Sequence, residues 1–546
     1  MLTLVFRCVS VGCDVRRLGA MTSCVTVCKR VHHIEVEFLK EADKVEHSLL
    51  LIKGRLQPIC ASAQQLKATL VVHNREQEQL TQLSAASEFK LLFDLSQESA
   101  KSKSNLGSDS VNCQLELRCC SGQRQLQFSY QPRRSAYRVQ PLYLVCRNSE
   151  KEPKDEVEQE QDTKRRCDLI DLNLRLVQCI YAHKLSATGY TNRTFTLNGA
   201  CCVFRSQLSC QEARQCSEDE LWQRFASEIL ASPDWGQQLQ LKFVAFIGCT
   251  WYDGAAVAAS EDYSYANIRR HLYAHAALGG GGLALFGSGH FYAWPQSFAD
   301  IGDCIRSTER VDVTRLPDES NYRRTYGGVY ASTLGAVCHE LGHCFDLGHT
   351  LEGVMGHGFD YLNRVLTVDQ PTEHLPQRMV STPPAAAAAA AEPTTSLPRP
   401  RFTQLKINQP ASSKFLDNYH AQRRNDSFYF AHNCAIVLAH HRWLQPDLEA
   451  STSAPPEVQL LPASKEVVSS VALRLIELRC NRNSLAAHYE EFKPEPATHR
   501  FRLPDALWHL LATQRTHYVF VLTIEGDTKR LAFDETPAAE KPQEEQ

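Results

Sequence analysis

Apolar and polar residues alternate along several short stretches between residues 31 and 148. The clearest of these stretches are 34–38, 66–72, 115–117 and 126–130, and polar gaps separate them. A period of two places one face of each strand in a core and the other in water. We therefore predict an antiparallel β-sandwich over residues 31–148, preceded by a disordered N-terminus over residues 1–30.

A charged stretch over residues 149–165 is predicted to link this sandwich to a larger domain over residues 166–445. Within that domain, apolar residues recur at helical spacing from Leu169 to Ile180, and Ser217 with Glu220 forms a capping box that predicts another helix start. The apolar run 241–249 predicts a buried strand. This alternation of helices and strands favours a twisted sheet with helices packed on it.

Four consecutive glycines, Gly279–Gly282, precede the apolar run 283–286. We expect them to form a flexible loop leading into an edge strand, along which an extended substrate would pair its backbone. The run lacks the Gly-Lys-Ser/Thr ending of a phosphate-binding loop, so nucleotide binding is not expected.

The pattern changes again towards the C-terminus. Residues 370–402, rich in proline and alanine, are predicted to be a disordered low-complexity insertion. A final helix of the larger domain is expected within residues 415–444, with His432, His440 and His441 on its surface. A linker over 446–457, a β-rich domain over 458–533 and a polar tail over 534–546 follow.

Composition narrows the functional classes. The chain has 546 residues, 43% of them hydrophobic, enough for about three folded domains. A net charge of -3 gives no attraction to nucleic acid, and no apolar run is long enough for membrane insertion. The 21 cysteines form no paired framework and the N-terminus lacks the apolar core of a signal peptide, so we expect a cytoplasmic protein with reduced thiols.

The strongest chemical signal is the segment 338–350, in which His339, Glu340, His343 and His349 lie close together in sequence. If the segment is helical, His339 and His343 lie four residues apart on one face and can bind one metal ion. After a turn, His349 would complete a three-histidine zinc site that keeps an open position for water. The alternative is a helix with surface histidines, but its apolar positions indicate a packed helix, namely Leu334, Val337, Leu341 and Phe345.

An open coordination position on the zinc ion is typical of a catalytic site. One zinc ion would lower the pKa of its bound water to about 7, and Glu340 would take the proton of that water as it attacks a peptide carbonyl. As general acid, Glu340 would then pass the proton to the leaving amine.

The segment resembles the zinc helix of the metzincins, HExxHxxGxxH, which is followed by a methionine-containing turn. The resemblance implies that Met355 forms the floor of the site. Over residues 320–365, including Gly353-Val354-Met355-Gly356-His357-Gly358, the chain looks like a little-characterised eukaryotic family of metzincin-like zinc metallopeptidases with undefined substrates.

The sequence departs from the metzincin pattern in two places. Asp346 stands where metzincins have a glycine that permits a left-handed backbone, a conformation that aspartate tolerates at some cost. Gly348 is another candidate for the turn, and Asp346, Glu352 and Asp360 are alternatives to His349 as third ligand. His357 stands where some metzincins have a tyrosine that stabilises the transition state, which makes it a candidate catalytic residue, with Tyr361 as a second candidate.

Taken together, the sequence predicts a multidomain α+β protein in which a metzincin-like zinc peptidase domain is flanked by N-terminal and C-terminal β-rich, sandwich-like domains. The predicted activity is that of a zinc-dependent metalloendopeptidase acting on protein or peptide substrates. The alternative is a catalytically inactive, zinc-containing scaffold or binding protein that uses its β-modules. Glu340 favours the enzyme, because a purely structural zinc site does not need this carboxylate.

Overall fold

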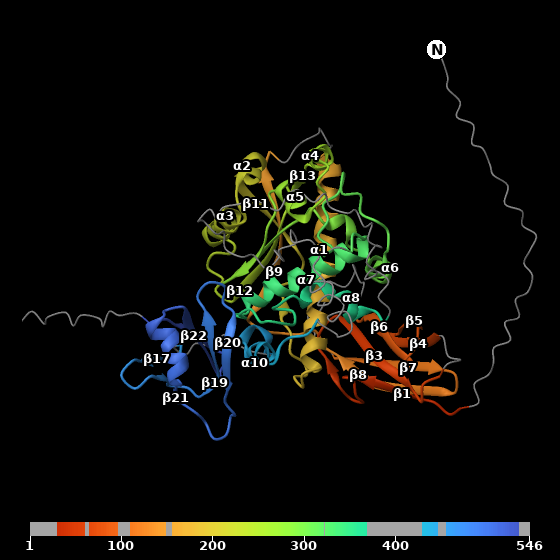
Figure 1. Cartoon of the computed structure of the whole chain (residues 1–546). Helices are drawn as coiled ribbons and strands as arrows, with labels where there is room; N and C mark the ends of the chain where they lie inside the picture. The colour runs from red at the N-terminus through yellow and green to blue at the C-terminus, as the bar shows by residue number, and fades with distance from the viewer. Residues whose placement is uncertain are drawn as a thin grey trace, which may run out of the picture.

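The computed structural model describes residues 30–60, 65–96, 110–148, 156–321, 323–368, 428–445 and 455–533. Three bodies are visible in Figure 1: an N-terminal β-sandwich, a central body of sheet and helices, and a C-terminal β body. The multidomain mixture of α and β structure predicted from the sequence is confirmed.

The N-terminal body is a sandwich of two sheets with the order β1-β3-β6 and β2-β8-β7-β4-β5. The strands are β1 (His33–Glu37), β2 (Lys44–Val45), β3 (Leu49–Gln57), β4 (Gln65–Val72), β5 (Arg75–Gln82), β6 (Glu88–Asp94), β7 (Val111–Cys119) and β8 (Gly122–Tyr130). Strand β4 is buried at every second residue, as the alternation predicts, and the inward side chains of both sheets form one core.

Strand β9 (Arg138–Arg147) differs from the sequence interpretation, which placed it in the sandwich. It lies inside the central sheet, between β12 and the strands β10 and β11. The physical reason is that six consecutive residues, 139–144, are buried, which is typical of a parallel strand covered on both faces. Helix α1 (Glu156–Ser186) likewise begins inside the stretch predicted to be a linker.

The central sheet has the order β10-β9-β12-β16-β15, with β11 also paired to β9. Its further strands are β10 (Thr196–Leu197), β11 (Cys202–Ser209), β12 (Leu241–Ile247), β15 (Ala277–Gly280) and β16 (Leu283–Gly287). All pairings are parallel except that of β15 with β16. The glycine run therefore starts within the edge strand β15 itself, whereas β16, expected to be the edge, is an inner strand.

Helices cover both faces of this sheet. Val244 and Phe246 of β12 share a core with α1 and α7 (Tyr326–Cys344), whereas Phe243 and Ala245 face the core beneath α2 (Cys210–Gln215) and α3 (Glu218–Ala231). Smaller elements are β13 (Trp251–Tyr252), β14 (Leu272–Tyr273), α4 (Gly254–Ser260), α5 (Tyr265–Arg270), α6 (Ile301–Arg306), α8 (Asn363–Leu366) and α10 (His432–His440). Helix α7 thus lies at the centre of the molecule (Figure 1).

The C-terminal body is β-rich, as predicted. Its sheets have the order β17-β18-β21 and β20-β19-β22-β23. The elements are β17 (Val458–Leu461), β18 (Glu466–Ser469), β19 (Leu473–Cys480), β20 (Ala486–Glu491), β21 (Arg500–Arg502), α11 (Asp505–Trp508), β22 (His517–Thr523) and β23 (Thr528–Leu531). One apolar cluster fills the space within this body.

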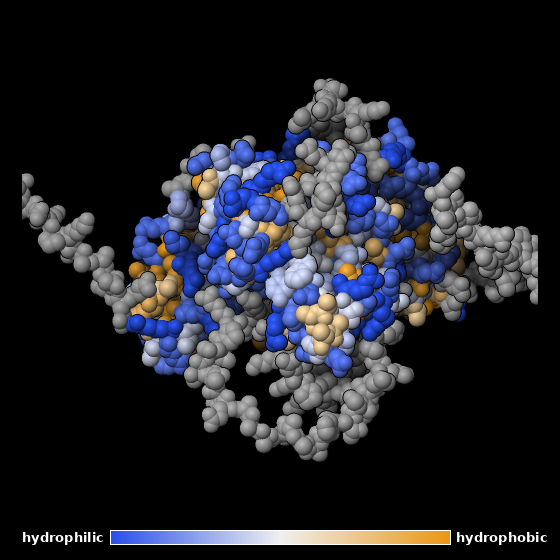
Figure 2. Space-filling view, turned by 90° about the horizontal axis from the view of Figure 1, so that it is seen from above, coloured by the Kyte–Doolittle hydropathy of each residue, from blue (hydrophilic) through white to orange (hydrophobic). Residues whose placement is uncertain are grey.

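Several predictions fall on residues that the structure does not describe. These are the N-terminus up to residue 29, the insertion 370–402, most of the linker 446–457 and the tail from residue 534. Among the described residues, no helix combines the length and the apolar character needed to cross a bilayer. On the face seen in Figure 2, hydrophobic residues form small separate patches within a hydrophilic surface.

Candidate metal centre

Helix α7 carries the motif and is packed on most sides. Its N-terminus is capped by Thr325, whose hydroxyl accepts the N–H of Gly328 at 3.0 Å. Two tyrosines anchor it inside the core: Tyr181 of α1 donates to the carbonyl of Cys338 at 2.6 Å, and Tyr330 donates to Asn173 at 2.8 Å. The apolar positions used in the sequence analysis are all buried, so the helix is not a free surface helix.

The structure brings the three histidines of the motif together. The ligand-type nitrogens of His339, His343 and His349 all lie within 4.8 Å of one another. The Nε2 atoms of His339 and His343 are 3.1 Å apart. This is about the separation of two nitrogens bound to one tetrahedral zinc ion, for which zinc–nitrogen bonds are about 2.0–2.1 Å.

Each ring is oriented by a backbone carbonyl at its opposite nitrogen. Nδ1 of His339 contacts the carbonyl of Val354 at 2.7 Å, Nδ1 of His343 contacts that of Leu347 at 2.9 Å, and Nδ1 of His349 contacts that of Asn483. A carbonyl only accepts, so Nδ1 carries the proton and the lone pair of Nε2 faces the common point. The donor set and the tautomers fit a zinc ion.

The three imidazoles are also neutral, as metal ligands must be. Burial lowers the pKa of His339 well below its usual range. Burial likewise lowers the pKa of His343 to about 4 and that of His349 to about 3.

Met355 lies against the motif helix. It is buried, and a Cβ on Gly342 would lie 2.7 Å from its sulfur. The carbonyl of Met355 accepts the N–H of Thr350 at 3.1 Å, which ties this turn to the segment after His349. A side chain at position 342 would therefore have to displace the sulfur of Met355.

Asp346 adopts the left-handed backbone that the metzincin glycine permits, with φ +61°. Its carboxylate accepts from the hydroxyl of Thr528 at 2.7 Å and lies 3.3 Å from Nε2 of His441. The prediction that His441 is a surface residue is wrong, because Asp346 and the surrounding core bury it to 2% exposure. Neither Asp346 nor the other proposed substitutes, Glu352 and Asp360, joins the three-histidine group.

Glu340 directly follows His339 on α7 and is buried under strand β15. Its Oε2 accepts the N–H of Gly279 at 2.7 Å, and a Cβ on Gly279 would lie 2.0 Å from the carbonyl oxygen of Glu340. Strand and helix thus approach so closely that only glycine fits. Burial raises the pKa of Glu340 to about 8, although the Gly279 N–H lowers it in part.

The two candidates for transition-state stabilisation have different surroundings. His357 directly precedes the short 3-10 helix Gly358–Tyr361 and is partly exposed. Burial is the main reason for the low pKa values of His339 and His349, but His357 is close enough to contribute to both. Tyr361 is buried, with its ring 4.2 Å from the guanidinium of Arg364.

The C-terminal body also holds His349, a contribution that was not predicted from the sequence. The N–H of His349 donates to the carbonyl of Ser484 at 3.1 Å, and the N–H of Ala486 donates to the carbonyl of His349 at 2.9 Å. With the contact from Nδ1 to Asn483, three hydrogen bonds hold this residue. They use backbone carbonyls and amides, which leave no signature in the sequence.

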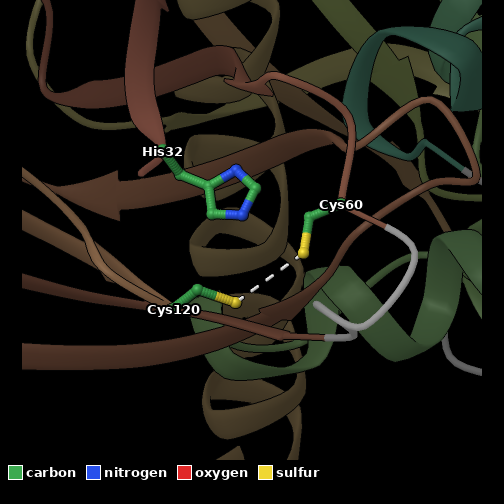
Figure 3. Close-up of side chains that lie close together, drawn as sticks. All are labelled: His32, Cys60 and Cys120. Atoms are coloured by element: carbon green, nitrogen blue, oxygen red, sulfur yellow. Dashed lines mark hydrogen bonds between the residues drawn. The ribbon is translucent and has the colours of Figure 1, made fainter. Parts of the chain in front are cut away.

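Two further groups of ligand-type side chains occur among the described residues. One is His275, His290 and Glu319, beside α7. The other is His32, Cys60 and Cys120, in the N-terminal sandwich. Figure 3 shows the two sulfurs of the second group facing each other, 4.0 Å apart, with the ring of His32 beside them. Neither group was predicted, because each gathers residues far apart in sequence.

Two known proteins are similar to this chain over part of its length. A Saccharomyces cerevisiae protein named "Putative zinc metalloproteinase YIL108W" is 37% identical over 94 residues, 16% of this chain and 14% of that protein. A Schizosaccharomyces pombe protein named "Putative zinc metalloproteinase C607.06c" is 26% identical over 187 residues, 34% of this chain and 27% of that protein. The chain therefore matches less than a third of the length of either relative.

A solved structure of Bifidobacterium dentium beta-glucuronidase covers 55% of this chain and 58% of its own, with 7% identity and a TM-score of 0.14. That similarity carries no argument about the fold. The family described as "Putative peptidase family" matches residues 33–442, about three quarters of the chain, including α7 and Met355. The chain therefore belongs to this peptidase family.

Proposed function

We propose that the chain is a zinc-dependent metalloendopeptidase of metzincin type, with His339, His343 and His349 as the ligands of one zinc ion. The single observation that carries this proposal is the convergence of three neutral imidazoles, with the buried Glu340 directly after the first of them on α7. A bound zinc ion would supply a Lewis acid for the peptide carbonyl and would lower the pKa of a coordinated water.

Glu340 is the proposed general base and, later, general acid. The N–H of Gly279 fixes the carboxylate at the site, so its position does not depend on the substrate. The charge of a bound zinc ion would favour the ionised form of this buried carboxyl, which would take a proton from the attacking water and deliver it to the leaving amine when the peptide bond breaks. Met355 supports the helix turn between the first two ligands.

Strand β15 is the proposed binding surface for the substrate backbone. It pairs with β16 on one side, and within the described residues no strand pairs with its other side. All four residues of β15 are partly exposed. A protein or peptide in extended conformation could therefore add to this edge beside Glu340. His357 is the proposed donor to the oxyanion of the transition state.

The decisive experiment compares the wild type with Glu340→Gln on a peptide library, with zinc content measured on the same samples. We expect a loss of activity of roughly 100-fold or more with zinc retained, because a general base contributes about this much. The matched control is Glu352→Gln, since Glu352 is exposed and belongs to no ligand group. Equal cleavage by wild type and Glu340→Gln would reject the assignment, and no cleavage by either would favour the inactive scaffold. The cytoplasmic location stays a prediction.

A further inference from the structure

Beside α7, two buried histidines face one glutamate. His275 is 6% exposed and His290 is 3% exposed. Within the described residues, both ring nitrogens of His275 and Nε2 of His290 are buried without a hydrogen-bond partner. Leaving a buried polar atom unpaired costs about 1–3 kcal/mol, so the unpaired Nε2 of His275, which faces Glu319, indicates a missing ligand.

The distances from the two histidine rings to the Glu319 oxygens fit ligands of one metal ion better than hydrogen-bonded groups. Nε2 of His275 lies 3.7 Å from Oε1 of Glu319, and Nδ1 of His290 lies 3.5 Å from Oε2. Both distances exceed those of ordinary hydrogen bonds, roughly 2.7–3.2 Å. They are close to the edge of a zinc tetrahedron, about 3.4 Å for bonds near 2.1 Å. Two groups bridged by one water would lie farther apart, about 4.6 Å for hydrogen bonds of 2.8 Å.

The space between these side chains suits one small occupant. They line a cavity of about 20 Å³ whose other walls include Phe246, Phe286 and Trp294. About 10–15 Å³ is enough for a single water or ion. The cavity therefore suits a single water or ion.

We propose that His275, His290 and Glu319 bind a second divalent cation, with zinc as the best match to two imidazoles and one carboxylate. Chelation by both oxygens of Glu319 would give four ligand atoms, which is a closed and therefore structural site. The nearby cation Arg269 approaches Oε1 of Glu319 at 3.4 Å but also pairs with Glu218, so the two carboxylates together outweigh its charge. Burial lowers the pKa of both histidines, which keeps their lone pairs available.

Such an ion would connect three segments around the proposed active site. His275 lies two residues before β15, His290 follows β16, and Glu319 lies in the segment that leads into α7. Gly279 of β15, which donates to Glu340, is four residues after His275. The ion would therefore fix β15 against α7 and, through Gly279, hold Glu340 in place.

The test is to count zinc in the full chain by elemental mass spectrometry, after zinc loading and dialysis into zinc-free buffer, and to measure Tm. We expect two ions in the wild type and one in both His275→Phe and Glu319→Gln. His343→Gln should also retain one ion, because this variant loses the ion of the three-histidine centre and keeps the second one. Because this count needs no peptidase activity, it succeeds or fails independently of the proposed function.

The Tm of the His275→Phe variant distinguishes between an ion and a water molecule in the cavity. If an ion is bound, the variant loses it and Tm falls. If the cavity holds only water, replacing an unpaired buried imidazole by an apolar ring leaves Tm unchanged or raises it. One zinc ion in the wild type, together with an unchanged or higher Tm in His275→Phe, would overturn the proposal.

The group in Figure 3 needs its own control, because Cys60, Cys120 and His32 could take up zinc in the same assay. Cys60→Ser removes one of its two sulfurs. If Cys60→Ser retains two ions while Glu319→Gln retains one, the second ion belongs to the proposed site. If Cys60→Ser loses an ion and Glu319→Gln does not, the assignment to His275, His290 and Glu319 is wrong.

Discussion

The imidazole of His349 donates its Nδ1 proton to the backbone carbonyl of Asn483, which lies 134 residues further along the chain. The third ligand of the proposed zinc site is thus oriented by a body outside the residues that match the peptidase family, 33–442. Loss of a hydrogen-bond partner that orients a metal ligand typically lowers metal affinity by about 10–100-fold. The C-terminal body consequently supports the proposed metal centre.

Gly348→Ala tests this dependence. A Cβ at Gly348 would lie 2.6 Å from the carbonyl oxygen of Ser484, so the added methyl group should push the C-terminal body away from His349. We expect zinc affinity to fall about 10-fold or more, as measured by competition with a chelating dye. The control is Gly302→Ala, where the nearest atom is a side-chain nitrogen of Arg306 at 3.4 Å. Equal affinities in the two variants would contradict the role of the C-terminal body.

Gly279→Ala and Gly280→Ala form a matched pair on strand β15. A Cβ at Gly279 would lie 2.0 Å from the carbonyl oxygen of Glu340, whereas a Cβ at Gly280 would meet nothing within 4 Å. Overpacking of this kind costs about 1–3 kcal/mol, and here it also displaces the N–H that holds the carboxylate of Glu340, the proposed general base. We expect Gly279→Ala to lower both Tm and kcat, while Gly280→Ala keeps the Tm of the wild type. If both variants melt alike, the close approach of β15 and α7 is not maintained in solution.

Asp346 gives a prediction about pH. Burial alone would raise its pKa, but the contacts with His441 and Thr528 and the charge of Lys242 outweigh burial and hold the pKa well below its usual range. A carboxyl whose pKa is lower in the folded state stabilises the protein above its unfolded pKa of about 3.9, and this stability is lost as pH falls towards the folded value. Asp346→Asn should therefore have a lower Tm than the wild type at pH 7, and the difference should shrink between about pH 5 and pH 3. If the Tm difference between the two proteins did not change with pH, the charge of Asp346 would make no contribution to stability.

The sequence predicted those parts of the molecule that local patterns encode. The alternation in β4, the capping box of Ser217 and Glu220, and the spacing of His339 and His343 each depend on residues close in the chain, and each appears in the structure. Strand β9 was assigned to the wrong body because a short apolar strand carries no mark of the sheet it joins. The contact of His349 with Asn483 could not be predicted, since any residue offers a backbone carbonyl.

His357→Gln tests the proposed stabilisation of the transition state. The residue follows Met355 by two positions and lies near His339 and His349 without belonging to the metal-binding group. Loss of one oxyanion donor typically lowers kcat by about 100–1000-fold, although a partly exposed residue is expected to contribute less, about 10-fold. Because this interaction forms only in the transition state, kcat and kcat/KM should fall together while zinc content stays constant. An increase in KM alone, with kcat unchanged, would instead assign His357 to substrate binding, and a loss of zinc would make it a ligand.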